Sequence, residues 1–494
     1  MRLQRLVEVS SQVAGTRSRL AKRELIAGLL RETPPDELEI ATAYLSGVLV
    51  QRRTGVGWRG LAELPPPADE PHLELVDIHR ALDRLAELAG PGSGAARRDQ
   101  VEELFGALTA PEQEYLRGLM TGNLRQGAQD SVVLDAIAEA AGIPPAVVRR
   151  AAMFSAPTGP VAHAALTGGE EALTRFTLEV GRPVRPMLAA SAPDLEAGAE
   201  KVGGGTFAVD TKLDGIRIQV HKQGEEVAVF TRSLEDIGDR LPGVVKRALE
   251  LPARDLVLDG EALALDAEGR PRPFQETASG MAELRPFFFD LLLHDDEPML
   301  TRPARDRLAR LDALVPEELR VARLVTASVQ QATAFFDATV GAGQEGVVLK
   351  RLDAAYDAGR RGSAWVKVKP RHTLDLVVLA VEWGSGRRRG WLSNIHLGAR
   401  DGDRFVMLGK TFKGMTDEML QWQTERFLEL ETGRERHVVH VRPEQVVEVA
   451  FDGVQRSPRY PGGVALRFAR VLRYRDDKPP AEADTLETVR DLLG

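Results

Sequence analysis

The chain has 494 residues, no cysteine and a formal net charge of -8 at pH 7, and this length predicts roughly three or four domains rather than one core. The absence of cysteine excludes disulfide bonds, thiol catalysis and cysteine-ligated zinc, so a bound metal should be a hard cation on carboxylates. No apolar run reaches the ~18 residues of a membrane span and no signal peptide precedes the charged N-terminal sequence, so we expect a cytoplasmic protein without a membrane segment.

Residues 1–178 are predicted to form an all-helical domain. Apolar side chains recur at helical spacing, and one such stripe comprises Leu75, Ile78, Leu82, Leu85 and Leu88. The segment Thr109–Glu112 has the pattern of a capping box with proline in the first helical turn. A glycine-bounded turn contains Arg125, a candidate for contact with a phosphate backbone, although such turns more often only connect helices.

Residues 179–371 are predicted to form an α+β domain. Prolines and glycines between Gly181 and Gly205 separate it from the helical part. Runs rich in branched and aromatic residues predict strands at 207–210, 216–221, 227–231, 256–258, 287–292 and 346–350. Helices are predicted at 234–249 and 304–314.

Residues 372–494 are predicted to form a small β-barrel of the OB type, a fold often used to bind nucleic acid. Strands are predicted at 374–381, 391–397, 405–408, 438–441 and 446–451, with a helix at 416–431. The segment 385–413 carries seven basic residues against two acidic ones. Its Arg387, Arg388 and Arg389 are candidate DNA contacts, although basic clusters are more often solvated faces.

The segment Val209–Arg217 (VDTKLDGIR) contains the most informative residue of the chain, Lys212. A lysine in water remains protonated because its pKa is ~10.4. Attack on phosphorus therefore requires nearby positive charge or burial to favour the neutral amine, and Arg217 could supply such charge. Alone, the short K-x-D-G-x-R pattern is more often a surface feature, but the downstream segments favour a catalytic interpretation.

Several segments downstream supply the other groups that nucleotidyl transfer requires. Arg232 follows a predicted strand, and Glu261 lies in LDGEA, where it could accept from a ribose hydroxyl or hold a metal. Phe289 in FFFDL could stack on a purine, whereas its two preceding phenylalanines fit a core position better. Glu345 in EGVVLK offers a second carboxylate, and Val348 an apolar contact for the opposite face of the base.

Two further segments carry clustered cations. The segment Arg361–Lys369 places Lys367 and Lys369 on one face of a strand, where an anion could lie between them and where both would lower the proton affinity of Lys212. Near the C-terminus, Arg475 and Lys478 form an R-x-D-K cluster suited to pyrophosphate.

In order and spacing, these segments and the flanking PVRPMLA sequence at 183–189 resemble the covalent nucleotidyltransferase superfamily. The resemblance is closest to the ATP-dependent DNA ligases of the archaeal and eukaryotic replicative type, which some bacteria also carry. It covers all three predicted domains. It implies a helical DNA-binding domain, an adenylation domain and an OB domain that closes over the nick.

The resemblance also implies a role for each site residue. Lys212 would be the adenylated lysine, and Asp210 would read the adenine amino group, at a position where the family usually has glutamate. The remaining implied contacts are Arg217, Arg232 and Glu261 for ribose and phosphate, Phe289 and Val348 for adenine, Glu261 and Glu345 for metal, Arg361, Lys367 and Lys369 for phosphate, and Arg475 and Lys478 for pyrophosphate.

The activity implied by the resemblance is sealing of 5′-phosphate and 3′-hydroxyl nicks through a lysine–AMP intermediate and a DNA-adenylate. ATP and Mg²⁺ are the implied cofactors. We expect a monomer that binds nicked double-stranded DNA in the cytoplasm, at the nucleoid, with a sliding clamp as a further partner. Replication, repair and recombination are the processes in which such an enzyme would act.

Three alternatives share parts of this pattern. An NAD-dependent ligase carries a cysteine-ligated zinc module, which this cysteine-free chain cannot form. RNA ligases and GTP-using capping enzymes lack a large helical domain before the lysine motif. A non-catalytic DNA clamp would not require the lysine nucleophile and its flanking carboxylates, so the retention of Lys212, Glu261 and Glu345 argues against it.

Overall fold

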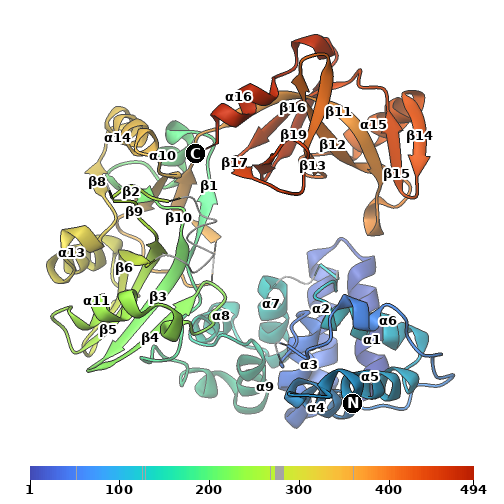
Figure 1. Ribbon diagram of the computed structural model, residues 1–494. Helices are drawn as coiled ribbons and strands as arrows, with labels where there is room; N and C mark the ends of the chain where they lie inside the picture. Colours follow the sequence, from blue (N-terminus) through green and yellow to red (C-terminus); the bar gives the residue numbers. More distant parts are fainter. Residues whose placement is uncertain are drawn as a thin grey trace.

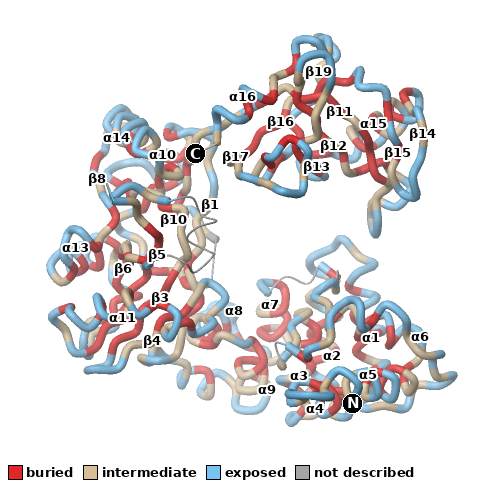
Figure 2. Tube along the Cα trace, in the orientation of Figure 1, coloured by how far each residue is buried: buried red, intermediate tan, exposed pale blue. Residues whose placement is uncertain are grey.

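The computed structural model describes residues 1–493 apart from 52, 125, 128–129, 268, 273–282 and 360, and it leaves out the side chains of Arg361 and Arg387. Figure 1 shows three bodies in chain order around an open arc: a helical one, a mixed α/β one and a β-rich one. The buried residues lie inside each of them (Figure 2). The predicted order of a helical, an α+β and a β-barrel domain is therefore confirmed. Within the described part of the chain, no helix combines the length and apolarity needed to cross a bilayer.

The helical domain packs short amphipathic helices around one hydrophobic core. Its α-helices are α1 (Leu3–Gly15), α2 (Arg19–Glu32), α3 (Leu38–Leu45), α4 (Leu75–Glu87), α5 (Ser93–Gly106), α6 (Ala110–Met120), α7 (Asp130–Ala141), α8 (Pro145–Met153) and α9 (Gly159–Leu173). The predicted stripe on α4 is buried from Leu75 to Leu85, and Leu88 packs against the core at the end of the helix. The predicted capping box at the start of α6 is confirmed, because the backbone N–H of Thr109 donates to the Glu112 carboxylate at 2.9 Å.

The central domain contains two sheets that face each other. One has the strand order β1-β10-β9-β2-β8 and the other the order β4-β3-β5-β6-β7. The strands are β1 (Leu188–Ser191), β2 (Phe207–Lys212), β3 (Ile216–Gln223), β4 (Glu226–Thr231), β5 (Asp255–Leu263), β6 (Arg285–His294), β7 (Glu297–Pro298), β8 (Arg323–Thr326), β9 (Gly346–Arg351) and β10 (Arg361–Val368). Helices α10 (Leu195–Lys201), α11 (Pro242–Leu249), α13 (Ala304–Leu314) and α14 (Val329–Gly341) flank them (Figure 1).

The predicted helices of this domain have different outcomes. The helix at 304–314 is confirmed as α13, whereas the helix predicted at 234–249 begins only at Pro242. Leu234 lies in a turn, where its backbone N–H donates to the Thr231 carbonyl. Its φ of 66° is a left-handed conformation that is incompatible with an α-helix. Proline in the first turn then starts α11 at a position where a missing N–H is tolerated.

The C-terminal domain is a curved, barrel-like sheet around a core of its own. Its strands are β11 (His372–Trp383), β12 (Leu392–Asp401), β13 (Arg404–Thr411), β14 (Glu431–Glu435), β15 (Val438–Val441), β16 (Val446–Phe451), β17 (Gly453–Arg456), β18 (Val464–Arg467) and β19 (Arg470–Arg475). The helices are α15 (Asp417–Glu429) and α16 (Leu486–Asp491). Strand β11 pairs first with β16 and then with β15 along its length, which bends the sheet.

Candidate active site

A pocket opens between the two sheets of the central domain and contains most of the predicted nucleotide-binding residues. The sheet built on β2, β9 and β10 contributes Leu188, Ala189, Asp210, Thr211, Lys212, Val348, Lys350, Trp365 and Lys367. The sheet built on β3, β5 and β6 contributes Arg217, Glu261 and Phe289, and Arg232 follows β4. The fold therefore gathers segments that are far apart in the sequence.

Lys212 is the last residue of β2, and its neighbours are set by the register with β9. In that register Lys212 is opposite Gly346, and Asp210 is opposite Val348. Gly346 has a φ of 137°, and a side chain there would collide with the Val368 carbonyl. Only glycine fits at this position, where β9 and β10 approach closely. The residue before Gly346 is Glu345, which lies beside Lys212.

Glu345 joins two lysines. One of its carboxylate oxygens pairs with the Lys212 ammonium and the other with Lys369. Lys369 also pairs with Asp452 of the C-terminal domain at 3.0 Å. Burial lowers the pKa of Lys369, but Glu345 and Asp452 outweigh this effect and raise the pKa above its ordinary value. The charge of Lys369 is thus neutralised by carboxylates and is not available as a bare cation beside Lys212.

Glu261 lies on β5 opposite Arg217 and faces the Lys212 end of the pocket. Its Oε1 accepts a hydrogen bond from the Gly215 N–H at 3.2 Å. Burial raises the pKa of Glu261 to about 7, against the opposing effects of Lys212 and Arg217. A side chain at Gly215 would meet the Ala262 carbonyl oxygen at 2.5 Å, which explains the glycine in the lysine motif.

Arg217 is held within the protein rather than extended into the pocket. Its Nε and Nη2 donate to the two oxygens of Asp259 at 3.0 and 2.7 Å, and its Nη1 donates to the Met187 carbonyl at 2.7 Å. The Tyr356 hydroxyl donates to the same Asp259 carboxylate at 2.7 Å. Burial alone lowers the pKa of Arg217, but Asp259 more than offsets it, so the pKa lies above its ordinary value. The Arg217 guanidinium therefore stays charged at the edge of the pocket.

Asp210 is 2% exposed, and both of its oxygens are occupied. Arg323 donates to it through Nε at 2.6 Å and Nη2 at 3.2 Å, and the Lys350 ammonium lies 2.7 Å from Oδ2. Lys350 also donates to the Phe289 carbonyl at 2.7 Å. Burial lowers the pKa of Lys350, although Asp210 opposes the shift. Asp210 is thus the anionic centre of a buried three-residue network.

Two aromatic rings form one wall of the pocket. Phe289 and Trp365 meet edge to face with centroids 5.9 Å apart. The Lys350 ammonium lies 4.9 Å from the Phe289 ring and 4.5 Å from the Trp365 ring. Val348 lines the pocket from the neighbouring strand β9. An aromatic wall with an aliphatic residue nearby is the type of surface on which a purine stacks.

Cations border the pocket. Lys367 lines it from β10, and exposed Arg232 lines both this pocket and a neighbouring hollow between the helical and central domains. The side chain of Arg361, which was predicted to hold phosphate, is outside the description.

The C-terminal domain touches the central domain beside the lysine motif. Arg467 donates to Asp214, two residues after Lys212, at 2.6 Å. In contrast, the predicted pyrophosphate residues Arg475 and Lys478 pair with Asp375 at 3.1 and 2.8 Å and line a separate hollow. The structure therefore brings Arg467 to the site and leaves Arg475 and Lys478 away from it.

The predicted DNA contacts lie at the surface or outside the description. Arg388 donates to the Phe412 carbonyl at 2.6 Å, and Arg389 is exposed. Arg125 and the side chain of Arg387 fall outside the described residues. Among the residues that the structure does describe, no group of three or more acidic, histidine or cysteine side chains could hold a metal by itself.

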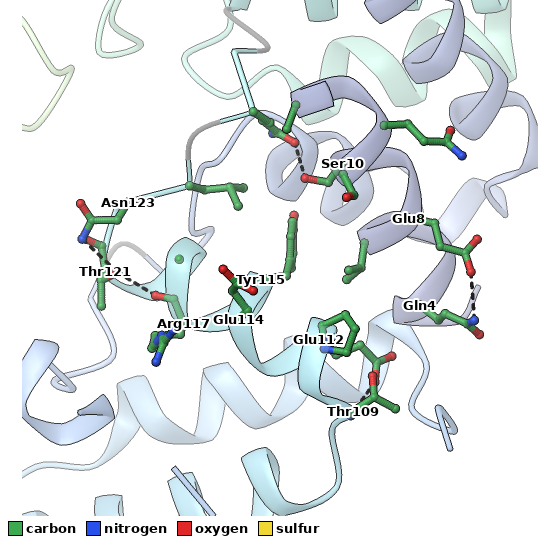
Figure 3. A pocket seen from close by; sticks show the side chains of 18 of the residues that line it. Gln4, Glu8, Ser10, Thr109, Glu112, Glu114, Tyr115, Arg117, Thr121 and Asn123 are labelled. Atoms are coloured by element: carbon green, nitrogen blue, oxygen red, sulfur yellow. Dashed lines mark hydrogen bonds between the residues drawn. The ribbon is translucent and has the colours of Figure 1, made fainter. Parts of the chain in front are cut away.

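A larger hollow of about 940 Å³ lies in the helical domain, compared with about 190 Å³ for the pocket at Lys212. Figure 3 shows that several of its polar residues pair with near neighbours in the sequence: Glu112 with Thr109, Gln4 with Glu8, and Asn123 with Thr121. The described residues that line it include no lysine. The larger hollow therefore lacks the candidate nucleophile that the smaller pocket contains.

Three family models match successive parts of the chain: DNA ligase N terminus over residues 59–138, ATP dependent DNA ligase domain over 186–369, and ATP dependent DNA ligase C terminal region over 388–478. A probable DNA ligase of Beutenbergia cavernae is 62% identical over 512 residues, with 100% of both chains covered. A probable DNA ligase of a Nocardioides species is 62% identical over 501 residues, covering 99% of this chain and 98% of the relative. The chain belongs to the ATP-dependent DNA ligase family.

The predicted family and enzyme class are thereby confirmed, and the alternatives of an NAD-dependent ligase, an RNA-modifying enzyme and a non-catalytic clamp are not favoured. The overall fold of the ligase also matches the solved structure Pmar-Lig_PreS3, with a TM-score of 0.64 at 20% sequence identity, covering 95% of this chain and 99% of that one.

Sequence reasoning missed four residues of this ligase that hold the site together: Asp259, Arg323, Lys350 and Tyr356. One signal was available for Lys350, because a lysine two residues after Val348 in an apolar strand must lie on the same face and needs a buried partner. Nothing local marks Arg323, whose partner Asp210 is more than a hundred residues away.

Proposed function

We propose that Lys212 is the residue that carries AMP in this DNA ligase. The observation that supports the proposal is the position of its ammonium, in a pocket between two sheets, on a carboxylate of Glu345 and beside Glu261. A lysine nucleophile must lose a proton before it attacks, and a bonded carboxylate is a suitable acceptor. The experiments below test this assignment and the nick-sealing activity together.

The proposed reaction has three steps. The neutral Lys212 Nζ attacks the α-phosphorus of ATP, so that an N–P bond forms, the bond to the bridging oxygen breaks and pyrophosphate leaves. A 5′-phosphate oxygen at the nick then attacks the same phosphorus, which breaks the N–P bond and yields a DNA-adenylate. Finally, the 3′-hydroxyl attacks the 5′-phosphorus, AMP leaves and the strand is joined. Such transfers depend mainly on alignment and charge neutralisation.

We assign the base end of the pocket to Phe289 and Val348, which would flank the adenine ring. Asp210 would read the amino group of adenine. Arg323 and Lys350 hold the orientation of the Asp210 carboxylate. Arg217 would contact the ribose and phosphate of the nucleotide while Asp259 holds its guanidinium in place. The phosphate end would be formed by Arg232, Arg361, Lys367 and Lys369.

We propose Mg²⁺ as the metal, held by Glu261 and Glu345 together with phosphate oxygens. The chemistry of the donors fits, since Mg²⁺ is usually bound by one or two carboxylates plus substrate phosphates. When bound, it would neutralise charge that develops on the phosphates. Glu261 is suited to this role because its carboxylate is buried and incompletely neutralised, as its pKa of about 7 reflects.

We propose nicked double-stranded DNA as the substrate, contacted by Arg125 of the helical domain and by Arg387, Arg388 and Arg389 of the C-terminal domain. For Arg475 and Lys478 to contact pyrophosphate, the C-terminal domain must turn so that these residues leave Asp375 and face the pocket. We divide the chain at 1–178, 179–371 and 372–494, which agrees with the separate hydrophobic clusters.

We further propose that the ligase acts as a monomer on the nucleoid in the cytoplasm, in replication, repair and recombination, with a sliding clamp as a partner. Sedimentation of the purified chain with and without nicked DNA tests the monomer. Labelled sliding clamp added to the same ligase and DNA tests the partner. The clamp should then sediment together with the ligase.

The assignment of Lys212 is tested with ATP labelled at the α-phosphate. The unsubstituted enzyme should retain label after denaturation, and Lys212→Ala should retain none. Lys369, the other lysine paired with Glu345, is held by Asp452 as well and is not the proposed nucleophile. Lys201→Ala is a matched control, since the ammonium of Lys201 lies at the surface and its described partner is the Ser191 carbonyl. Equal labelling of the Lys212 variant and the unsubstituted enzyme would contradict the assignment. Sealing of a nicked duplex with ATP, but not with NAD, tests the overall reaction.

A further inference from the structure

Arg185 lies in the segment that leads from the helical domain into the central domain. The described partners of its guanidinium all lie in the helical domain: Nε donates to the Ser155 carbonyl at 2.9 Å, Nη2 donates to the Thr158 hydroxyl at 2.9 Å, and Nη1 pairs with Asp130. Nη2 also donates to the Ala156 carbonyl at 3.2 Å. The Arg185 residue is 8% exposed, and its bonds to Ser155 and to the Thr158 hydroxyl are buried, whereas the Asp130 side chain is 54% exposed.

The acceptors are themselves ordered by the helical domain. Asp130 is the first residue of α7, and Thr158 precedes α9. The Thr158 hydroxyl donates to Asp130 at 3.0 Å, so one guanidinium joins the starts of two helices and the turn between α8 and α9. The backbone N–H of Arg185 adds a bond to the Met153 carbonyl at 3.0 Å.

The residues that follow Arg185 belong to the nucleotide pocket. After Pro186, Met187 accepts from Arg217 through its carbonyl at 2.7 Å and donates to the Tyr356 hydroxyl through its N–H at 3.0 Å. Leu188 then begins β1 and lines the pocket. Three consecutive residues thus connect the helical domain to the network around Arg217, and proline between the two anchors removes one degree of backbone freedom.

Apolar packing also joins the helical domain to the central domain here, but it does not fix their relative orientation. Met153 and Phe154 of the helical domain pack against a cluster that contains Val184 and Met187. Apolar packing is non-directional, whereas a planar guanidinium with several acceptors defines an orientation. In Figure 1 the ends of α8 and α9 lie next to the central domain at this junction.

We propose that Arg185 is a positioning residue that sets the orientation of the helical domain relative to the nucleotide pocket. This inference rests on the proposed function, since it assumes that the helical domain binds the nicked duplex. The orientation matters only when DNA must be presented to Lys212, so Arg185 contributes to the two steps on DNA and not to the reaction of Lys212 with ATP. Misplacement by about 1 Å can slow such alignment-dependent steps by up to 100-fold.

The test separates the ATP step from the DNA steps in the full-length enzyme. For Arg185→Ala, we expect lysine labelling by ATP to stay within about twofold and the KM for nicked duplex in sealing to rise roughly tenfold or more. Sealing of a nick that already carries AMP should fall in parallel. Arg185→Lys should give a similar defect, because one ammonium cannot reach acceptors spread over a fork. Arg182→Ala is the matched control, since the described ion pair of Arg182 is with Glu179, a partly exposed neighbour in the sequence.

A double substitution tests whether Arg185 acts through its partners. If it does, adding Asp130→Ala to Arg185→Ala should raise the KM for nicked duplex no further. Thr158→Val removes one acceptor and should give a smaller rise, which keeps the test informative if Arg185→Ala folds poorly. An unchanged KM in the Arg185 and Thr158 variants, or equal losses of lysine labelling and sealing in a folded variant, would overturn the proposal. Failure of the unsubstituted enzyme to label or seal would instead overturn the proposed function.

Discussion

The nucleotide pocket and the Arg475–Lys478 cluster of the C-terminal domain both place cations on an aspartate, but they do so in different surroundings. Around Asp210, the side chains of Lys350, Arg323 and Asp210 are 2%, 9% and 2% exposed. Around Asp375, the side chains of Arg475 and Lys478 are 19% and 21% exposed, and Arg475 also binds Asp477 at the surface. The first network is almost completely buried, whereas the cations of the second keep about a fifth of their side-chain surface in contact with water.

This difference follows from the cost of desolvating charge. Removing one member of a buried ion network leaves the others without a partner in a poorly polarisable environment. Partly exposed pairs are screened by water and contribute little to stability. The network around Asp210 is therefore preorganised, while Arg475 and Lys478, the cations proposed for pyrophosphate, remain partly hydrated on Asp375.

The largest effect is expected from Asp210→Ala. The substitution leaves Arg323 and Lys350 buried without their shared anion and should destabilise the protein by about 3–5 kcal/mol. Urea unfolding at constant pH measures this change. A decrease in unfolding free energy below about 1 kcal/mol would show that the buried network contributes no more to stability than a surface ion pair does.

An intermediate effect is expected at Glu261, whose pKa is raised to about 7. Because the folded state binds this proton more tightly than the unfolded state, the contribution of Glu261 to stability should fall as pH rises from about 4.5 to about 7, by no more than ~3 kcal/mol. Glu261→Gln removes this titration. The unfolding free energy of the variant should therefore change less between about pH 4.5 and about pH 7 than that of the unsubstituted enzyme.

The same carboxylate should govern the pH profile of lysine labelling. Since the ionised form is the one proposed to hold Mg²⁺, labelling at limiting Mg²⁺ should increase as pH rises through about 7. Glu261→Gln should label at least roughly tenfold more slowly and without this increase. A wild-type profile that is flat between pH 6 and 8 would contradict the role assigned to Glu261.

The smallest effect is expected from Asp375→Ala. Arg475 and Lys478 would lose a partner but remain in contact with water, so the midpoint of thermal unfolding should not change measurably and lysine labelling should stay within about twofold. Arg475→Ala should slow labelling while leaving the same midpoint unchanged. If Asp375→Ala unfolded the C-terminal domain, the contrast between the two networks would be lost.

Local patterns were sufficient for much of the fold. The capping box at Thr109 and the helix at 304–314 depend on interactions within a few residues, and both are confirmed. The helix expected from Leu234 failed because a left-handed turn at that residue is selected by the hairpin between β4 and Asp236, not by helical periodicity. Strands β17 to β19 were not predicted, because each is short and ends in arginine, without a long run of branched or aromatic residues.

By itself, the sequence determined the order of the domains and the family, and it indicated Lys212 as the candidate nucleophile, because these depend on residue types at fixed spacing. Only the tertiary structure decided which charges meet. It placed Asp210 on Arg323 and Lys350, Glu345 between Lys212 and Lys369, and Arg185 on the helical domain. These partners lie far apart along the chain, and strand register and domain packing, which no local pattern encodes, bring them within bonding distance.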